Sequence, residues 1–578
     1  MKDYMKIYEE WLANPYFDED TKKELRAIQG DENEIKERFY MDLEFGTAGL
    51  RGVIGAGINR MNIYTVRRAT QGLADYILEQ GGADRGVAIA YDSRRMSPEF
   101  SDEAARTLAA NGIKAYRFES LRPTPELSFA VRELGCIAGI NITASHNPPE
   151  YNGYKVYWED GAQFTPPHDR GVTEKVMAIT DLSSVKTMSR EEAVASGRYV
   201  TIGAEIDDRY IAQVKAQVVN QEAIDKMQDQ IAIVYTPLHG TGNIPARRVM
   251  KELGFEHVYV VPEQELPDGN FPTVSYPNPE AAEAFELGLK LAKEKNADLV
   301  LATDPDADRL GVYVKDTKSG EYIPLTGNMS GSLLCDYVLS QKKERGQIPA
   351  DGQVVKSIVT TNLVDAVAEY YGAELIEVLT GFKWIGKQIL KNEQEGRGTY
   401  LFGMEESYGC LIGTYARDKD AISATAALCE AAAYYKEKGM TLWDAMVAMY
   451  ERYGYYKDDI QSITLKGIEG LAKIQEILET LRKNPPAEIA GYKVLKARDY
   501  KADTIQDMQT GEVSSTGLPT SNVLYYDLSD DAWLCVRPSG TEPKVKFYYG
   551  IKGTSLSDAD EKSAAMGKEV LAMIDKIM

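Results

Sequence analysis

Residues 139–158 read GINITASHNPPEYNGYKVYW, and the rest of the chain is organised around this stretch. Its apolar first part predicts a buried strand that ends at Thr143. The polar loop that follows carries Ser145, His146 and Lys155. Ser145 is a candidate nucleophile, although a serine after a strand is more commonly a turn former or a helix cap, and no GxSxG elbow surrounds it.

The same order of a strand followed by polar or glycine-rich residues recurs along the chain. Strands are predicted at 87–91, 137–143, 231–235, 299–303, 354–359 and 399–402, with helices at 62–80 and 98–111. Alternation of strands with helices predicts an α/β fold whose sheets are largely parallel or mixed and are covered by helices. Ligands bind beyond the carboxyl ends of strands in such sheets, and the polar residues fall at those ends.

The last part of the chain has a different pattern. Strands predicted at 460–465, 492–496, 523–526, 533–536 and 544–550 accompany helices at about 468–483 and 556–577. This pattern predicts a smaller α+β domain with an antiparallel sheet. A chain of 578 residues exceeds one hydrophobic core, and we expect domains over 1–208, 209–322, 323–455 and 456–578. The first of these begins with a helical arm over 1–40.

Composition narrows the class of protein. The net charge of −22 argues against a nucleic-acid partner, but it allows small phosphorylated ligands held by a few local cations. Five widely spaced cysteines without a CxxC pair fit a reducing compartment and no zinc site. The N-terminal residues lack an apolar signal core, and no apolar run is long enough to cross a membrane. We therefore expect a soluble cytoplasmic enzyme without a membrane partner, and the sequence does not predict its oligomeric state.

Residues 304–309 read DPDADR and follow the strand at 299–303. Asp304, Asp306 and Asp308 stand at alternate positions, so their carboxylates can converge on one side of an extended turn. Hard oxygen ligands of this kind suit Mg²⁺. An EF-hand is excluded because Arg309 stands where its loop needs glycine. The sequence favours a metal site over a solvated acidic turn.

Three further segments carry residues suited to phosphates and sugars. RPSGTEPK at 537–544 combines an arginine with two hydroxyls and a glycine, which is typical of an anion-binding turn, although a plain strand-to-strand turn is the alternative. GMEESYG at 403–409 offers acceptors for sugar hydroxyls or, alternatively, acids at a helix N-terminus. TGFKWIG at 380–386 pairs a lysine with aromatics, and its alternative is a turn with apolar packing.

Taken together, these stretches resemble the α-D-phosphohexomutase family, and its phosphoglucomutase-type members more closely. The motifs that carry the resemblance are FGTAGLRG (45–52), TASHNPPEYNGYK (143–155), DPDADRLG (304–311), TGFKWIG, GMEESYG and RPSGTEPK. The resemblance implies four domains around a central cleft, three of them mixed α/β and the last α+β with an antiparallel sheet. It implies interconversion of glucose 1-phosphate and glucose 6-phosphate through a phosphoserine and a glucose 1,6-bisphosphate intermediate.

The resemblance also implies a role for each matching residue. Ser145 is the phosphoserine, and Asp304, Asp306 and Asp308 hold one Mg²⁺ together with an oxygen of that phosphoserine. Lys155 is the general acid or base, and His146 is a further catalytic candidate that orients the loop. Substrate contacts are implied for Arg51, Arg309, Lys383, Glu405, Ser407, Arg537, Ser539, Gly540 and Thr541.

One departure from the family pattern affects the proton carrier. In the GExSGH form of the sugar loop a histidine follows the serine, whereas Tyr408 and Gly409 follow Ser407 here. The absence of that histidine places more weight on Lys155. The same loop, with GFKWIG, favours glucose over mannose phosphates.

Several activities fit the pattern besides a phosphoglucomutase. A phosphopentomutase, a phosphomannomutase and a hexose-bisphosphate synthase are alternatives within the family. A metal-dependent phosphatase with a serine nucleophile, and a sugar-phosphate binding protein without catalysis, are alternatives outside it. The expected partners are small sugar phosphates, with Mg²⁺ as cofactor and glucose 1,6-bisphosphate as activator.

Overall fold

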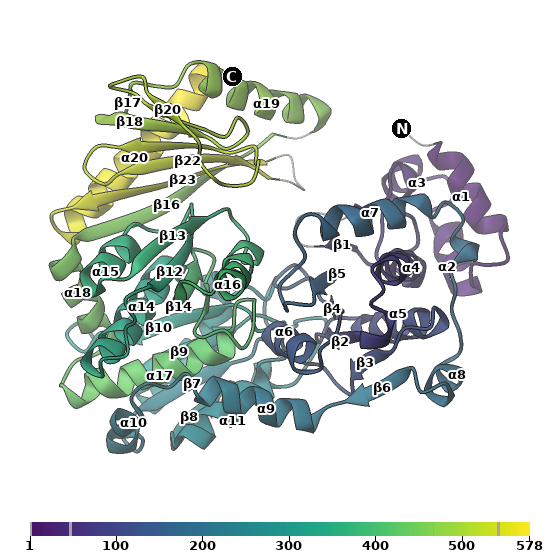
Figure 1. Ribbon diagram of the computed structural model, residues 1–578, viewed down its shortest axis with the longest axis horizontal. Coiled ribbons are helices and arrows are strands. Elements are labelled where there is room, and N and C mark those ends of the chain that lie inside the picture. Colours follow the sequence, from purple (N-terminus) through teal and green to yellow (C-terminus); the bar gives the residue numbers. More distant parts are fainter. Residues whose placement is uncertain (1–2, 45–48, 466, 540–543, 578) are drawn as a thin grey trace. The chain divides into compact units, whose positions relative to one another are not determined.

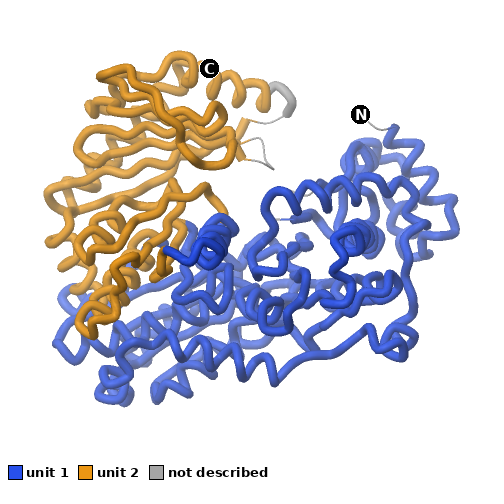
Figure 2. The backbone as a smooth tube through the Cα atoms, in the orientation of Figure 1, with its two compact units in different colours: residues 1–327, 382–397, 407–441 blue, residues 328–381, 398–406, 442–578 orange. Residues whose placement is uncertain are grey.

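The computed structural model describes residues 3–44, 49–465, 467–539 and 544–577. Its chain forms two compact units, coloured separately in Figure 2. The first unit holds residues 1–327, 382–397 and 407–441, and the second holds residues 328–381, 398–406 and 442–578. The segments TGFKWIG and GMEESYG therefore each pass from the second unit into the first.

Three helices form the arm predicted over residues 1–40. They are α1 (Tyr4–Ala13), α2 (Glu19–Ala27) and α3 (Glu32–Phe39). An aspartate precedes each helix and accepts a backbone N–H of the first turn, which satisfies one of the donors that a helix start leaves free. Trp11 and Phe17 stack in the aromatic core of the arm, with ring centroids 4.0 Å apart.

The first α/β sheet leads to Ser145. Its strands lie in the order β1 (Leu50–Val53), β5 (Tyr151–Trp158), β4 (Ala138–Ile142), β2 (Val87–Tyr91), β3 (Ala115–Phe118) and β6 (Tyr199–Ile202). The last four are parallel to one another, whereas β5 is antiparallel to β4 and to β1. The helices that accompany this sheet are α4 (Ile63–Glu79), α5 (Ser97–Ala110), α6 (Thr124–Glu133), α7 (His168–Ala178) and α8 (Arg190–Ala195) (Figure 1).

The second sheet leads to the three aspartates. Its strands lie in the order β11 (Tyr322–Leu325), β10 (Leu310–Lys315), β9 (Leu299–Thr303), β7 (Ala232–Thr236) and β8 (His257–Val260). Helices α9 (Ala204–Lys215), α10 (Gln221–Met227), α11 (Asn243–Leu253), α12 (Pro262–Glu265) and α13 (Glu286–Lys295) belong to this part of the chain. The first unit also contains α16 (Lys383–Glu395), β15 (Gly409–Leu411) and α17 (Ala421–Glu437), and α17 packs on α10 and α11.

The second unit begins with a third set of parallel strands. These are β13 (Glu374–Val378), β12 (Gly352–Ser357) and β14 (Thr399–Glu405), with β12 between the other two. Their helices are α14 (Gly327–Glu344), α15 (Leu363–Tyr371) and α18 (Leu442–Tyr453). Val354 and Val355 of β12 are fully buried, as the apolar run at this position predicts.

An antiparallel sheet forms the C-terminal part of the second unit. Its strands lie in the order β16 (Tyr455–Thr464), β23 (Lys544–Gly553), β22 (Trp533–Pro538), β21 (Leu524–Leu528), β18 (Tyr492–Asp499), β19 (Thr504–Asp507) and β20 (Val513–Ser514), and β17 (Glu488–Ile489) pairs with β18. Helix α20 (Leu556–Ile577) packs on β16 and β23, and α19 (Gly467–Lys483) packs on α20.

The predicted fold class is confirmed: the chain contains three α/β sheets with parallel strands and a C-terminal antiparallel sheet. The central cleft and the four domain boundaries stay predictions. The prediction that Lys155 lies in the loop after Ser145 is wrong, because Lys155 lies within β5. The strand forms there because residues 152–158 are buried and pair with both neighbours. Within the described parts of the chain, no helix has the length and apolarity needed to span a bilayer.

Candidate active site

Ser145 is held in an unusual backbone conformation directly after β4. Its φ is +51°, in the left-handed region that residues other than glycine rarely adopt. The backbone N–H of Ser145 donates to Thr143 Oγ1 at 2.8 Å, and Thr143 Oγ1 donates to Asp92 Oδ2 at 2.6 Å. A strained residue that its surroundings fix in this way is typical of a functional site, where the strain positions a side chain in advance.

Arg94 fixes the rest of the reactive loop. Its side chain is buried and pairs with Asp92, with 3.4 Å between Nε and Oδ2. The guanidinium donates to the carbonyl oxygens of Ser145 at 2.6 Å, Pro148 at 2.8 Å and Tyr151 at 3.1 Å. A buried arginine that satisfies several loop carbonyls makes the loop rigid, so the Ser145 side chain is presented in one orientation.

The three aspartates of DPDADR converge as the alternate spacing predicts. All three are buried, and one carboxylate oxygen from each lies within 4.8 Å of the others. Ala307 has a φ of +50°, and the turn is tied by backbone N–H groups of Asp308 and Arg309 that each donate to Asp304 Oδ1 at 3.1 Å. In the described chain, Asp306 Oδ1 and Asp308 Oδ1 are buried without a hydrogen-bond partner.

These carboxylates fit a divalent cation. Burial and the neighbouring carboxylates raise the pKa of Asp304 well above its usual range and also raise the pKa of Asp308. Burial also acts to raise the pKa of Asp306. The positive charge of Lys155 and the hydrogen bonds that Asp306 receives outweigh burial, so the pKa of Asp306 is lowered. Three buried acids with two oxygens lacking donors are costly without a positive charge, and oxygen-only ligands suit Mg²⁺. The triad can therefore bind a metal ion.

Ser145 and Lys155 both meet this triad. Ser145 Oγ donates to Asp304 Oδ2 at 2.7 Å. Lys155 Nζ donates to Asp306 Oδ2 at 2.7 Å and lies 3.9 Å from Asp308 Oδ2. The structure thus brings the candidate nucleophile, the candidate proton carrier and the candidate metal ligands together from two different sheets.

His146 lies beside the nucleophile, and Arg51 contacts the same loop. His146 Nδ1 is 3.1 Å from Ser145 Oγ. Burial and the cations Arg309 and Arg51 lower the pKa of His146 well below its usual range, so its imidazole is neutral near pH 7. Arg51 donates to Asn147 Oδ1 at 3.0 Å. Arg309 pairs with Glu280 at 2.5 Å, and its Nε lies 3.9 Å from Asp308 Oδ1.

Lys419 is a site residue that the sequence analysis missed. Its Nζ lies 3.1 Å from Asp308 Oδ2 and 3.2 Å from Asp418 Oδ1. Tyr157, two positions after Lys155 on β5, donates to Asp418 Oδ2 at 2.8 Å. The sequence signal was the alternating charge of RDKD at 417–420; the structure shows that all four residues are buried and therefore need partners within the fold.

Residues of the predicted sugar and phosphate loops lie partly in the second unit, which holds Glu405, Arg537 and Ser539. Glu405 ends β14, and its Oε1 accepts the backbone N–H of Gly381 at 2.7 Å, so the acids of GMEESYG do not begin a helix. Arg537 lies on β22, and Ser539 N–H donates to the carbonyl oxygen of Lys544, the first residue of β23, at 2.7 Å.

The remaining predicted contacts fall in different places. Gly540 and Thr541 lie outside the described residues. Ser407 lies two positions after Glu405 and belongs to the first unit. Lys383 is the first residue of α16 and lines a cavity with Lys387 and His168, so its contact with a substrate stays a prediction.

Comparison with known proteins identifies the family. Models described as "Phosphoglucomutase/phosphomannomutase, alpha/beta/alpha domain" I, II and III match residues 42–183, 208–320 and 326–453. A phosphoglucomutase of Staphylococcus saprophyticus is 35% identical over 555 residues, which cover 96% of this chain and 98% of that protein. The chain belongs to the phosphoglucomutase/phosphomannomutase family.

Other members of this family support the fold along nearly the whole chain. A phosphoglucomutase of Staphylococcus aureus strain MRSA252 is 36% identical over 540 residues, covering 93% of this chain and 95% of that protein. The solved structure of parafusin, a phosphoglucomutase from Paramecium in its open form, has a TM-score of 0.68 at 18% identity and covers 93% of this chain and 95% of that one. A family protein from Burkholderia thailandensis has a TM-score of 0.64 at 20% identity, covering 92% and 97%.

Proposed function

We propose that this family member is a phosphoglucomutase that interconverts glucose 1-phosphate and glucose 6-phosphate. The observation that carries the proposal is the contact of Ser145 Oγ with Asp304 Oδ2 at 2.7 Å, in a buried triad in which two carboxylate oxygens have no donor among the residues that the structure describes. A hydroxyl in that position is suited to carrying a phosphoryl group, because a metal ion beside it offsets the charge of that group. The curated relatives with 35–36% identity that carry the name phosphoglucomutase favour glucose as the sugar.

The reaction needs one group transfer in each direction. A phosphoryl group on Ser145 Oγ passes to the free hydroxyl of the hexose monophosphate, so the bond from phosphorus to Ser145 Oγ breaks and a bond to the sugar oxygen forms. The hydroxyl proton leaves the sugar, and Ser145 Oγ gains a proton. The product of this step is glucose 1,6-bisphosphate, which turns end for end and returns its other phosphate to Ser145.

Lys155 is the proposed proton carrier for this exchange. It is buried beside Ser145 on the neighbouring strand, and its Nζ is held by Asp306 at 2.7 Å. Asp306 is in turn fixed by Thr124, whose Oγ1 donates to Asp306 Oδ2 at 2.8 Å and accepts from Asn141 Nδ2 at 2.7 Å. Neutral His146 hydrogen-bonds Ser145 Oγ and orients it.

Asp304, Asp306 and Asp308 would hold one Mg²⁺, with an oxygen of phosphorylated Ser145 as a further ligand. When bound, this ion supplies positive charge that stabilises the transferring phosphoryl group. Arg309 and Arg51 would add positive charge on the substrate side, and Lys419 would keep Asp308 in place through their 3.1 Å contact.

The phosphate that is not reacting needs an anchor of its own. We assign this role to Arg537, Ser539, Gly540 and Thr541, because a cation beside a turn rich in N–H groups and hydroxyls binds phosphate. Glu405 and Ser407 would accept and donate hydrogen bonds to the sugar hydroxyls. We place the protein in the cytoplasm, with sugar phosphates as its small-molecule partners.

The test is a side-by-side assay on the 1-phosphates of glucose, mannose, ribose and N-acetylglucosamine with Mg²⁺ and catalytic glucose 1,6-bisphosphate. We expect the highest kcat/KM with glucose 1-phosphate, stimulation by the bisphosphate, and phosphate on Ser145 in peptide mass spectra. A higher kcat/KM for mannose 1-phosphate or ribose 1-phosphate would show that the preferred substrate is that sugar phosphate and not glucose 1-phosphate. Release of inorganic phosphate at the rate of isomerisation would instead indicate a phosphatase.

A further inference from the structure

Asp306 divides its two carboxylate oxygens between the protein and the proposed metal site. Its Oδ2 accepts from Thr124 Oγ1 at 2.8 Å and from Lys155 Nζ at 2.7 Å. Its Oδ1 is buried and, among the described residues, accepts no hydrogen bond. Only one oxygen of Asp306 is therefore left for an ion.

Asp308 and Asp304 divide their oxygens in the same way. Asp308 Oδ2 lies 3.1 Å from Lys419 Nζ, and Asp308 Oδ1 also lacks a hydrogen bond in the part of the chain that the structure describes. Asp304 Oδ1 accepts two backbone N–H groups at 3.1 Å, which leaves Oδ2, the oxygen that meets Ser145 Oγ. Each of the three carboxylates thus has one oxygen to give to an ion.

Carboxylates that offer one oxygen each distinguish between two common divalent ions. Mg²⁺ is small and requires about six oxygen ligands in a nearly ideal octahedron. Ca²⁺ is larger, takes about six to eight ligands, and commonly binds both oxygens of a carboxylate. Three carboxylates that cannot turn both oxygens to the ion therefore suit Mg²⁺ better than Ca²⁺.

Thr124 is the donor that keeps Asp306 in this orientation. It is fully buried at the first position of α6, and its backbone N–H donates to the carbonyl oxygen of Asp306 at 2.9 Å. Its hydroxyl accepts from Asn141 Nδ2 at 2.7 Å, so the single hydroxyl proton is directed to Asp306 Oδ2. Because a β-branched side chain has few rotamers, this donor cannot follow the carboxylate if it turns.

Lys155 does not fix the carboxylate in the same way. Its ammonium group stands at the end of a flexible four-carbon chain, and its Nζ also lies 3.9 Å from Asp308 Oδ2. The ammonium group can therefore stay paired with the triad while Asp306 rotates. The rigid donor to Asp306 Oδ2 is Thr124.

The backbone of the metal turn is held by the starts of three helices. Consecutive carbonyl oxygens of residues 305–307 accept the backbone N–H groups of Thr241, Thr124 and Ala421 at 2.8, 2.9 and 3.2 Å. Thr124 and Ala421 begin α6 and α17, and Thr241 lies two positions before α11. A turn tied to three helices resists widening, and a rigid site of this kind disfavours an ion that needs more ligands.

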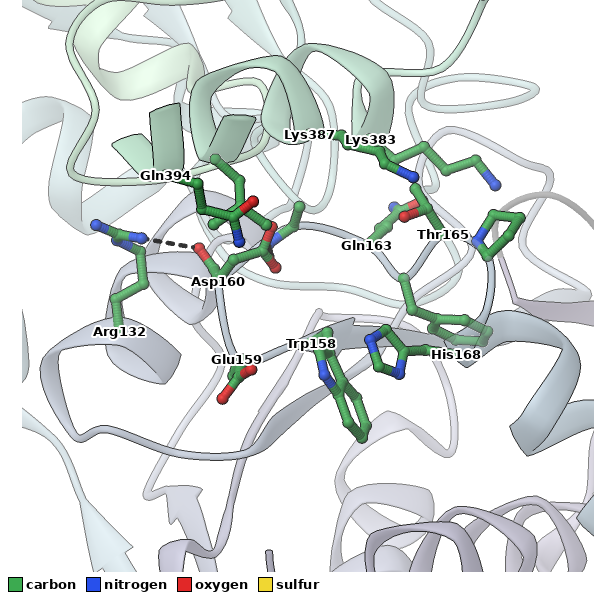
Figure 3. Close-up of a pocket in the computed structure, with 14 residues that line it drawn as sticks. Arg132, Trp158, Glu159, Asp160, Gln163, Thr165, His168, Lys383, Lys387 and Gln394 are labelled. Carbon is green, nitrogen blue, oxygen red and sulfur yellow. Dashed lines mark hydrogen bonds between the residues drawn. The ribbon is translucent and has the colours of Figure 1, made fainter. Parts of the chain in front are cut away.

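The donor to Asp308 is restrained from outside the turn. Lys419 Nζ lies 3.1 Å from Asp308 Oδ2 and 3.2 Å from Asp418 Oδ1. Asp418 Oδ2 accepts from Tyr157 Oη at 2.8 Å, and Tyr157 Oη accepts from Gln163 Nε2 at 3.2 Å. Gln163 lies in the wall of the cavity drawn in Figure 3. These contacts hold Lys419 against one oxygen of Asp308 and leave the other oxygen to an ion.

We propose that Thr124 is a positioning residue that makes the metal site selective for Mg²⁺ over Ca²⁺. Its hydroxyl withholds Asp306 Oδ2 from the ion, so the site offers single oxygens and not the two-oxygen binding that Ca²⁺ uses. The inference rests on the proposed Mg²⁺ site, and its test measures the binding of both ions and not turnover.

Calorimetric titration of the full chain with Mg²⁺ and, separately, with Ca²⁺ gives the ratio of the two dissociation constants, Ca²⁺ over Mg²⁺. The wild-type ratio should lie well above one. Thr124→Val keeps the branched shape but removes the donor, so the ratio should fall by about tenfold, because Asp306 becomes free to offer both oxygens. Thr124→Ser keeps the hydroxyl and should keep the wild-type ratio.

Thr241→Val is the matched control. Thr241 Oγ1 donates to the carbonyl oxygen of Pro305 at 2.9 Å and not to a carboxylate, so its loss loosens the same turn without releasing a ligand oxygen. Both dissociation constants should rise by similar factors, and their ratio should stay at the wild-type value. Asn141→Ala frees the Thr124 hydroxyl to turn away, so it should lower the ratio by a smaller factor, and it replaces Thr124→Val if that variant does not fold.

The outcomes separate this inference from the metal site on which it rests. An unchanged ratio in Thr124→Val, or an equal fall in Thr241→Val, would overturn the role of Thr124 while the metal site stands. A wild-type chain that binds Ca²⁺ as tightly as Mg²⁺ would do the same. A wild-type chain that binds neither ion would overturn the proposed metal site and the role of Thr124 with it.

Discussion

Two buried lysines, one in each unit, look alike until their partners are compared. Lys155 on β5 is 4% exposed, and its Nζ lies 2.7 Å from an oxygen of Asp306. Lys356 on β12 is 0% exposed, and its Nζ lies 2.5 Å from an oxygen of Asp365. Burial and pairing alone therefore do not distinguish a catalytic lysine from a structural one.

The partners of the two lysines show the difference. Lys356 Nζ also donates to Asn362 Oδ1 at 3.0 Å and to the carbonyl oxygen of Thr361 at 3.4 Å, so protein acceptors surround it. The partner of Lys155 belongs to a triad in which two carboxylate oxygens have no donor among the described residues. Asp365 Oδ1 also lacks a hydrogen bond there, but it lies 2.5 Å from Lys356 Nζ, whereas Asp308 Oδ1 lies 3.9 Å from Arg309 Nε. A buried carboxylate oxygen without a close cation can take up a ligand, whereas one that lies directly against a lysine holds the fold; the Lys155 pair is therefore called incomplete and the Lys356 pair complete.

The largest effect should come from Ser145, which lies beside the incomplete pair. Ser145→Ala removes the oxygen that carries the phosphoryl group, so kcat should fall by at least about 10⁴-fold. The melting temperature should change little, because the loop is held by Arg94 and Thr143 and not by Ser145 Oγ. Coupled-assay kinetics and peptide mass spectra for phosphoserine measure the result, and near-normal turnover in this variant would remove the serine from the mechanism.

Asp308 tests whether the triad is incomplete because it awaits a cation. Asp308→Asn should lower kcat by about 10²- to 10⁴-fold and weaken Mg²⁺ binding by about a hundredfold. Without Mg²⁺ the variant should melt at or above the wild-type temperature, because one of three repelling buried charges is gone; with saturating Mg²⁺ the order should reverse.

Thermal melts with and without chelator, together with calorimetric titration of Mg²⁺, measure this reversal. Asp229→Asn, an exposed aspartate elsewhere in the first unit, serves as the matched control and should show neither change. An Asp308→Asn protein that binds Mg²⁺ as tightly as the wild type would show that the triad is not the metal site.

Replacing each lysine by methionine contrasts the two pairs directly. Lys155→Met should lower kcat by about 10²- to 10⁴-fold, as loss of a general acid or base does, with a stability loss that Mg²⁺ reduces. Lys356→Met should cost about 3–5 kcal/mol of unfolding free energy, because it strands buried acceptors, and Mg²⁺ should not restore it. Equal stability losses that Mg²⁺ leaves unchanged in both variants would contradict the distinction between the pairs.

Much of this arrangement follows from local sequence. Apolar runs that end in polar residues predict strand ends within one residue: β4 ends at Ile142, directly before Thr143, and β9 ends at Thr303, directly before Asp304. The alternate aspartates converge because a short turn after a strand keeps them together. Such features depend on a few neighbouring residues, so periodicity and spacing are enough to predict them.

Contacts between distant segments could not be predicted in the same way. Lys419 approaches Asp308 only because α17 and the DPDADR turn fold into one unit, and RDKD alone does not indicate its partner. Lys155 is predicted in the loop after Ser145, but pairing with β1 and β4 extends strand β5 over it.

The smallest expected effect is a pH dependence of the unfolding free energy that comes from Asp458, a carboxylate near the Lys356–Asp365 pair. Asp458 on β16 is half-buried, and burial raises its pKa to about 7, although Thr361 and Lys356 act against it. In the unfolded chain an aspartate has a pKa of about 4. Between about pH 4 and 7 the folded protein therefore binds more protons than the unfolded one, and the Asp458 contribution to stability is lost as the pH rises through 7.

Asp458→Asn removes that proton uptake, so the unfolding free energy of the variant minus that of the wild type should rise from pH 4 to 7 and then level off. Urea unfolding at intervals of pH measures this difference, with Asp459→Asn, its exposed neighbour, as the matched control that should give a flat line. A flat line for Asp458→Asn as well would mean that this carboxylate is ionised throughout. In that case the region around Lys356 would hold an unneutralised acid of its own, and it would resemble the Lys155 region more closely than its contacts suggest.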